Sequence, residues 1–146
     1  MSEVQITMIP AEHAFALWPK VRAHIAGATA RSHGRYDPED VLESVITGEH
    51  TLWVAFDGKD VLGAVTSYPI DYPRKRVMFV HFCGGTRLKD WSHEMFRVIQ
   101  HWAYDNKCVC IESNGRDGWA RIFKDDGFEP IWTGFELPAA DCGLGG

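Results

Sequence analysis

Groups able to do chemistry gather in one short stretch of this 146-residue chain. His81 supplies an imidazole, whose ordinary pKa of about 6.5 suits proton transfer near neutral pH. Gly84 and Gly85 let other groups approach the backbone closely, and Arg87 and Lys89 would add positive charge beside an anion bound there. The stretch therefore combines a candidate proton acceptor with a candidate anion site.

Thiol groups offer a second chemistry. His81 and Cys83 are expected on one face of a strand, and Cys108 and Cys110 on one face of the next strand. Four such groups could bind zinc, but zinc ligands usually lie two to four residues apart on turns that can wrap the ion. A Cys–His nucleophile would need a third, orienting residue, which nothing in the sequence marks. We therefore expect buried, reduced cysteines that act as small apolar side chains, and no metal.

The composition is that of one soluble globular domain. The chain has 15 Lys plus Arg against 20 Asp plus Glu, and this net charge of -5 argues against nucleic acid or an anionic membrane as a partner. No apolar run approaches the roughly 18 residues that cross a bilayer, and the first ten residues lack the features of a signal peptide. We expect a single domain over residues 1–137, a flexible tail over 138–146, and a cytoplasmic location.

Hydrophobic periodicity predicts strands and helices along the whole chain. The expected elements, in chain order, are a strand over Val4–Ile9, a helix over Ala11–Ala30, a helix that starts at Asp37 and Pro38 and ends before Gly48, strands over Thr51–Phe56, Val61–Tyr68 and Arg76–Cys83, a helix over Trp91–Asn106, a strand over Cys108–Glu112, a helix over Gly118–Asp126, and strands over Phe128–Trp132 and Gly134–Leu137. Pro19 should divide the first helix into two pieces, because proline lacks the N–H that a helix interior needs. Asp90 or Ser92 could cap the helix over Trp91–Asn106.

These elements predict an α/β fold, more closely a mixed α+β sheet with helices on both faces. The order is β-α-α-β-β-β-α-β-α-β-β, with a central, mostly antiparallel sheet of six or seven strands. Antiparallel hairpins come first, and the helix over Trp91–Asn106 then connects two parallel neighbouring strands.

This order of elements resembles the GNAT superfamily of N-acetyltransferases, from Val4 to about Leu137. The resemblance implies that acetyl-CoA binds where the fourth and fifth strands separate, with its pyrophosphate on backbone N–H groups before the third long helix. The implied cofactor-binding residues are Phe82, Cys83, Gly84, Gly85, Thr86 and Arg87. The alternative is that the two glycines only turn the chain from strand to helix, with Arg87 and Lys89 in solvent.

N-acetyl transfer needs a base for the acceptor amine. The first candidate is His81 and the second is Glu112, at the end of the next strand. The alternatives are a strand histidine satisfied by its neighbours and a glutamate that is solvated or paired with Arg116. In related enzymes a tyrosine of the last helix often protonates the CoA thiolate. Here Phe123 stands at that position, and its side chain has no proton to give.

A narrower resemblance points to bacteriophage. Gly84, Gly85, Trp91, Cys108 and the run Gly115–Trp119 look like a group of tailed-phage proteins with a GNAT-like fold, as does Trp102 followed by Ala103. This resemblance implies a viral protein in the host cytoplasm or the virion. Two functions stay open: transfer of an acetyl group from acetyl-CoA to an unknown amine, and an inactive GNAT-fold phage protein that acts through protein contacts. A third is a small-ligand module that uses the same cleft without chemistry.

Overall fold

The computed structural model describes residues 3–114 and 119–139. The chain divides into two compact units, Met1–Asn114 and Gly115–Gly146. The elements are β1 (Val4–Ile9), α1 (Ala11–Thr29), α2 (Pro38–Ile46), β2 (Thr51–Asp57), β3 (Asp60–Asp71), β4 (Arg76–Gly85), α3 (Leu88–Asp105), β5 (Cys110–Ser113) and α4 (Ala120–Asp125). Within the described ranges, no helix has the length and apolar character needed to cross a membrane.

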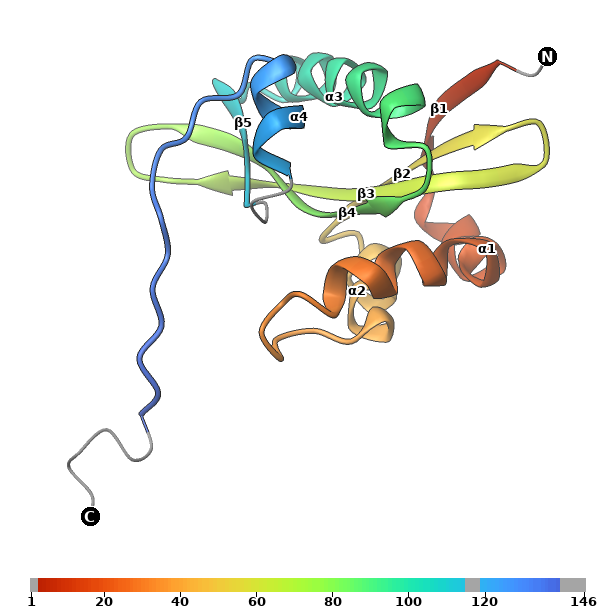
Figure 1. Cartoon of the computed structure of the whole chain (residues 1–146), viewed down its shortest axis with the longest axis horizontal. Helices are drawn as coiled ribbons and strands as arrows, with labels where there is room; N and C mark the ends of the chain where they lie inside the picture. Colours follow the sequence, from red (N-terminus) through yellow and green to blue (C-terminus); the bar gives the residue numbers. More distant parts are fainter. Residues whose placement is uncertain (1–2, 115–118, 140–146) are drawn as a thin grey trace. The chain divides into compact units, whose positions relative to one another are not determined.

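One mixed sheet organises the first unit. Its five strands lie in the order β1-β2-β3-β4-β5. The first four are antiparallel to their neighbours, and β5 is parallel to β4. Helices α1 and α2 cover one face of this sheet and α3 covers the other (Figure 1). The predicted class, a mostly antiparallel sheet with helices on both faces, is confirmed, with five strands in place of six or seven.

The two strands predicted near the end of the chain, over Phe128–Trp132 and Gly134–Leu137, are not formed. Neither segment pairs with a strand in the part of the chain that the structure describes. A strand needs hydrogen-bonded neighbours as well as a favourable side-chain pattern, and the pattern alone cannot supply them. The apolar side chains of Ile131, Trp132 and Phe135 are exposed instead.

Helix α1 is continuous through Pro19, so the predicted division into two pieces is wrong. Proline removes the hydrogen bond to the carbonyl four residues earlier, which belongs to Phe15. Phe15 and Pro19 are both exposed, so this gap lies on the solvent side, where water can replace the lost donor. The helix is held from its other side, where Ala14, Val21 and Ile25 are fully buried.

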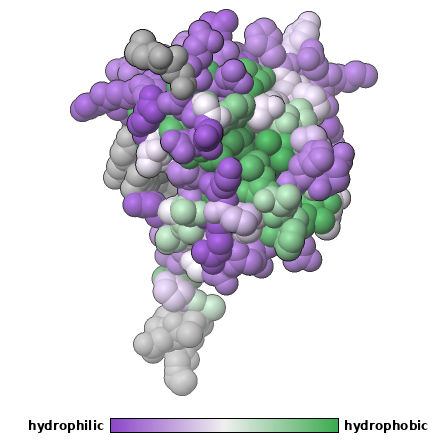
Figure 2. Space-filling model, turned by 90° about the vertical axis from the view of Figure 1, so that its right-hand side faces the viewer, coloured by the Kyte–Doolittle hydropathy of each residue, from purple (hydrophilic) through white to green (hydrophobic). Residues whose placement is uncertain are grey.

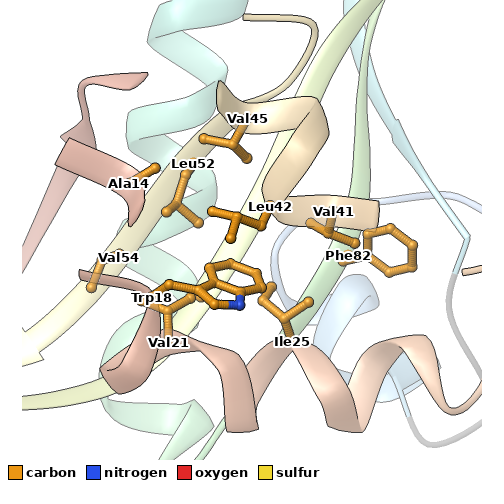
Figure 3. Packing of buried hydrophobic residues seen from close by; sticks show 11 residues of the cluster. Ala14, Trp18, Val21, Ile25, Val41, Leu42, Val45, Leu52, Val54 and Phe82 are labelled. Atoms are coloured by element: carbon orange, nitrogen blue, oxygen red, sulfur yellow. The ribbon is translucent and has the colours of Figure 1, made fainter. Parts of the chain in front are cut away.

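The core beneath α1 and α2 joins both helices to the sheet. Trp18 and Leu42 lie at its centre, and Phe82 lies at one side next to Val41 (Figure 3). The two helices are also tied by Glu39, whose carboxylate accepts hydrogen bonds from the indole of Trp18 (3.3 Å) and the guanidinium of Arg22 (2.7 Å). These bonds lower the pKa of Glu39 to about 2. The shared core and these hydrogen bonds therefore hold α1 and α2 in place on this face of the sheet.

A second core lies between α3 and the opposite face. Trp91 is fully buried and donates its indole N–H to the carbonyl of Thr86 (2.7 Å). Further along, Trp53 and Trp102 meet edge to face with their ring centroids 5.9 Å apart. In the side view, hydrophilic side chains surround one hydrophobic area of the surface (Figure 2).

Candidate active site

Strand β4 contains a one-residue β-bulge at His81. Thr66 of β3 lies opposite Phe82 and Ser67 lies opposite Val80, so His81 is an extra residue with no partner on β3. The amide of Phe82 donates to Oγ1 of Thr66 at 3.2 Å, which helps to hold the irregular geometry. A bulge re-aims a side chain out of the regular alternation. The rings of His81 and Phe82 accordingly stack with their centroids 4.0 Å apart, although the two residues are neighbours in sequence.

The bulge places His81 and Cys83 on opposite faces, so the prediction of a shared face is wrong. Phe82 belongs to the core beneath α1 and α2, and His81 stacks on it. Cys83 lies opposite Val65, whose neighbour Ala64 is in that same core. Since successive residues alternate between faces, Cys83 faces α3. Burial raises the pKa of its thiol, so Cys83 stays protonated. The described residues contain no metal-binding cluster of three.

Four rings besides that of Phe82 surround His81. Tyr36 meets it edge to face at 4.8 Å between centroids, and His50, Tyr68 and Phe79 lie at 5.4 to 5.5 Å. His50 also stacks on Tyr68 at 4.4 Å. We call Tyr36, His50, Tyr68, Phe79 and His81 the aromatic platform; each is partly exposed. No sequence pattern linked the other members to His81, because only the fold brings these separate segments together.

The two imidazoles of the platform are biased towards their neutral forms. Burial, and then the nearby His50, lower the pKa of His81 to about 4. Burial also lowers the pKa of His50, against a smaller opposite effect of Glu49. Nδ1 of each ring is buried and makes no hydrogen bond with the described residues. His81 therefore has a lone pair for a proton at neutral pH, and Nε2 is the nitrogen left to meet a ligand.

Acidification is expected to destabilise the protein between about pH 6.5 and pH 4.5. The folded-state pKa of His81, about 4, lies below its unfolded value, so the unfolded chain binds the proton first and stability falls as pH falls. The carboxylate of Glu39 acts in a lower window, between its ordinary 4.5 and about 2. Urea midpoints across the upper window should fall less steeply in His81→Gln than in the wild type. If the urea midpoints of the two proteins fell equally with pH, the lowered pKa of His81 would be contradicted.

Glu112, the second predicted base, lies on β5 opposite Phe79 in the parallel β4–β5 pair. Paired residues share a face, so Glu112 lies on the same face as the aromatic platform. Arg116, the partner predicted for Glu112, lies outside the described residues. Of the two predicted bases, His81 belongs to the aromatic platform and Glu112 does not.

Strands β4 and β5 separate beside His81. Their pairing ends at Val80 and Ser113, where the Ser113 hydroxyl donates to the Val80 carbonyl (3.1 Å). Further along β4, the Thr86 amide donates to Leu62 of β3 (2.7 Å). Since ladder residues alternate in direction, the amides of Cys83 and Gly85 point away from β3, towards the side where β5 has ended. Among the six predicted cofactor-binding residues, Cys83 and Gly85 therefore have backbone N–H groups on the edge of β4 that no longer pairs with β5 in the described structure.

The predicted glycines are required by packing. A Cβ on Gly84 would collide with the carbonyl oxygen of His24 in α1. A Cβ on Gly85, whose φ is 152°, would collide with the Leu62 carbonyl and with Gly63. Both glycines are the last residues of β4, just before the connection to α3, so the alternative of a simple strand-to-helix turn stays open. Because Gly84 and Gly85 have no side chains, α1 and β3 can approach β4 closely.

Helix α3 begins immediately after this strand, at Leu88. The predicted caps Asp90 and Ser92 therefore lie inside the helix, and Arg87 precedes it with a left-handed φ of 52°. The Arg87 guanidinium binds Asp90 at 2.7 Å and Asp57 at 3.0 Å. The amides of Leu88 and of Lys89 precede the helix's own hydrogen-bond ladder. An anion bound at the start of this helix could accept hydrogen bonds from these two amides directly. Arg87 could bind the anion only after its ion pairs with Asp57 and Asp90 break.

Replacing Thr66 by valine is expected to destabilise the protein by about 1–3 kcal/mol, because the buried Phe82 amide loses its acceptor. The bulge should also become less well fixed. Thr66→Ser keeps the hydroxyl and serves as the matched control. Urea unfolding measures both variants, and equal losses in valine and serine would show that the hydrogen bond is unimportant.

Comparison with known proteins identifies the fold. No protein-family model and no curated protein sequence matches the chain. Among solved structures, a probable acetyltransferase superposes with a TM-score of 0.71 at 16% identity, over 94% of this chain and 99% of that one. Ribosomal-protein-alanine N-acetyltransferase from Brucella melitensis biovar Abortus 2308 gives 0.71 at 15% identity, over 92% and 98%. Aminoglycoside N-acetyltransferase AAC(6')-Iy in complex with CoA gives 0.69 at 13% identity, over 96% and 97%.

The chain therefore has the fold of the GNAT N-acetyltransferases. The strand order, the parallel β4–β5 pair and the covering helices agree with the fold expected from the sequence. At these identities the likeness shows the fold alone, so the chemistry has to be argued from the residues around His81.

Proposed function

We propose that the protein is an N-acetyltransferase that transfers an acetyl group from acetyl-CoA to an amine. The observation that carries the proposal is the bulge at His81. It brings a neutral imidazole to the point where β4 loses its β5 neighbour. Bulges are frequent beside active sites, where they direct one side chain out of a sheet.

The described residues fit the cofactor at two places. The Cys83 and Gly85 amides on the open edge of β4 can donate to oxygens of acetyl-CoA, and the amides of Leu88 and Lys89 can donate to its phosphates. Phe82, Gly84 and Thr86 would contribute mainly to shape, since the Phe82 and Thr86 amides are already bonded to β3. Arg87 would add charge once released from Asp57 and Asp90. When bound, acetyl-CoA supplies the activated acetyl group.

The chain's own residues would perform three tasks. Nε2 of His81 accepts the proton that the amine loses, and the Cys83 amide stabilises negative charge on the carbonyl oxygen. The aromatic platform holds the acceptor in place. Glu112, on the same face, is the second candidate for the base. Phe123 has no acidic hydrogen, so water is left to protonate the departing thiolate.

The test combines binding with turnover. Isothermal titration of acetyl-CoA into the full chain should show saturable binding, and primary amines should then release CoA. No heat at millimolar acetyl-CoA, from protein shown to be folded by circular dichroism, would overturn the proposal. Gly85→Asp is unsuitable for blocking the site, because any side chain there collides with β3. Arg87→Gln is preferable, since Arg87 is half-exposed and lies outside both cores.

A second candidate function is that of an inactive GNAT-fold phage protein, virion-associated or host-directed. The observation that favours it is the row of exposed apolar side chains of Ile131, Trp132, Phe135 and Leu137, which a protein partner could cover. This candidate predicts no acetyl-CoA binding and a partner that stays bound through purification. The titration above separates the two candidates.

A further inference from the structure

The aromatic platform gives the proposed acceptor site an unusual surface. Its five rings come from the loop after α1, the segment before β2, and strands β3 and β4. They contact one another directly, with centroid separations of 4.4 to 5.6 Å. Each of these five residues is partly exposed. A flat aromatic group can stack on such a surface without displacing any of the rings.

The platform is poorly suited to a buried cation. An ammonium ion is held best by ring faces that surround it, whereas these rings already touch and leave no such space between them. Burial lowers the pKa of His50 and of His81 and raises the pKa of Tyr68, so all three side chains are neutral at neutral pH. Glu49 beside His50 and Glu112 opposite Phe79 would attract a cation, so the lack of space between the rings, and not the charge around them, is what disfavours a bound ammonium ion.

We propose that the acceptor is a weakly basic aromatic amine whose ring stacks on Tyr68 of the platform, with its nitrogen at His81. The proposal rests on the proposed acetyltransferase function and adds the substrate class. An aromatic amine is uncharged at neutral pH, so it reaches the rings without losing a proton and without burying a positive charge.

The chemistry balances with His81 as a weak base. The amine nitrogen forms a bond to the acetyl carbon, and the thioester C–S bond breaks. The amine loses one proton to Nε2 of His81, and the departing thiolate takes one up from water; His81 then returns its proton to water. A strong base is not required, because the nitrogen becomes acidic only as the new bond forms. An alkylammonium ion would have to be deprotonated before that bond could form.

The test compares aniline with cyclohexylamine, which has a ring of similar size but is aliphatic and protonated at neutral pH. CoA release by the full chain should be at least tenfold faster with aniline, measured as kcat/KM at neutral pH. Tyr68→Leu should raise KM for aniline about 5- to 150-fold, the effect of losing one stacking ring, with little change in kcat. Tyr68→Phe, which keeps the ring, should raise KM for aniline far less than Tyr68→Leu does. Tyr104→Leu, which alters an exposed tyrosine of α3, is the matched control.

The outcomes separate this inference from the function on which it rests. Equal or faster use of cyclohexylamine, or equal effects of Tyr68→Leu on both amines, would overturn the aromatic class and leave the acetyltransferase standing. Acetylation of other amines but not of aniline would do the same. Absence of acetyl-CoA binding would remove both. Titration of acetanilide, the expected product, into wild type and Tyr68→Leu checks stacking without turnover, and equal affinities would also overturn the inference.

Discussion

Replacing His81 by asparagine is expected to lower kcat for acetyl transfer by about 10²- to 10⁴-fold, the usual contribution of a positioned general base. Asparagine is polar and of similar size but cannot take up the proton. The affinity for acetyl-CoA should change little, because the Cys83 and Gly85 amides that face the open edge of β4 belong to the backbone. Steady-state CoA release and isothermal titration measure the two effects separately.

The matched control is His101→Asn, which alters an exposed histidine of α3 and should leave kcat and KM unchanged. A His81→Asn protein that is folded, binds acetyl-CoA and turns over at the wild-type rate would show that His81 is not the base. Glu112→Gln would then become the informative variant, since Glu112 lies on the same face at the end of β5.

Replacing Trp91 by alanine is expected to lower the free energy of unfolding by about 3–5 kcal/mol, as large-to-small changes in a core do. Trp91 has no exposed surface, and its indole N–H is bonded to the carbonyl of Thr86, the residue that follows β4. The variant therefore leaves both a cavity and a carbonyl without its donor. Urea unfolding gives the value, and Tyr104→Ala on the exposed side of the same helix should cost far less.

A double-mutant cycle tests the contact that fixes Trp91. A Cβ on Gly63 of β3 would collide with the Trp91 ring, so Gly63→Ala should cost about 1–3 kcal/mol. In a Trp91→Leu background the smaller side chain leaves room, and the same change should cost much less. Additive losses, within about 0.5 kcal/mol, would mean that the two residues do not compete for space.

The parts of the fold that depend on local signals could be predicted. The Asp57 and Gly58 turn places the β2–β3 hairpin, and Asp37 with Pro38 starts α2 where the sequence indicated. Local signals failed where tertiary context decides. Pro19 is tolerated because its side of α1 faces solvent. The strands predicted after Phe128 lack neighbours among the described residues.

The candidate site could be predicted only in part. The imidazole of His81 stood out by residue type, but its surroundings depend on the β3–β4 register, which a single sequence does not encode locally. The alternation rule placed Cys83 beside it, and one extra residue reversed that result. Tyr36 and His50 carried no signal, because nothing in the sequence says which loops meet above β4.

The bulge also has an evolutionary consequence. Val80 pairs with Ser67 and Phe82 pairs with Thr66, so these partners would remain matched if the chain passed directly from Val80 to Phe82. His81 is thus the one residue of this region whose codon could be gained or lost without changing any other cross-strand pair. Such a sheet can acquire the proposed proton acceptor through a single in-frame insertion, and can lose it by a deletion that leaves the fold's pairing scheme intact.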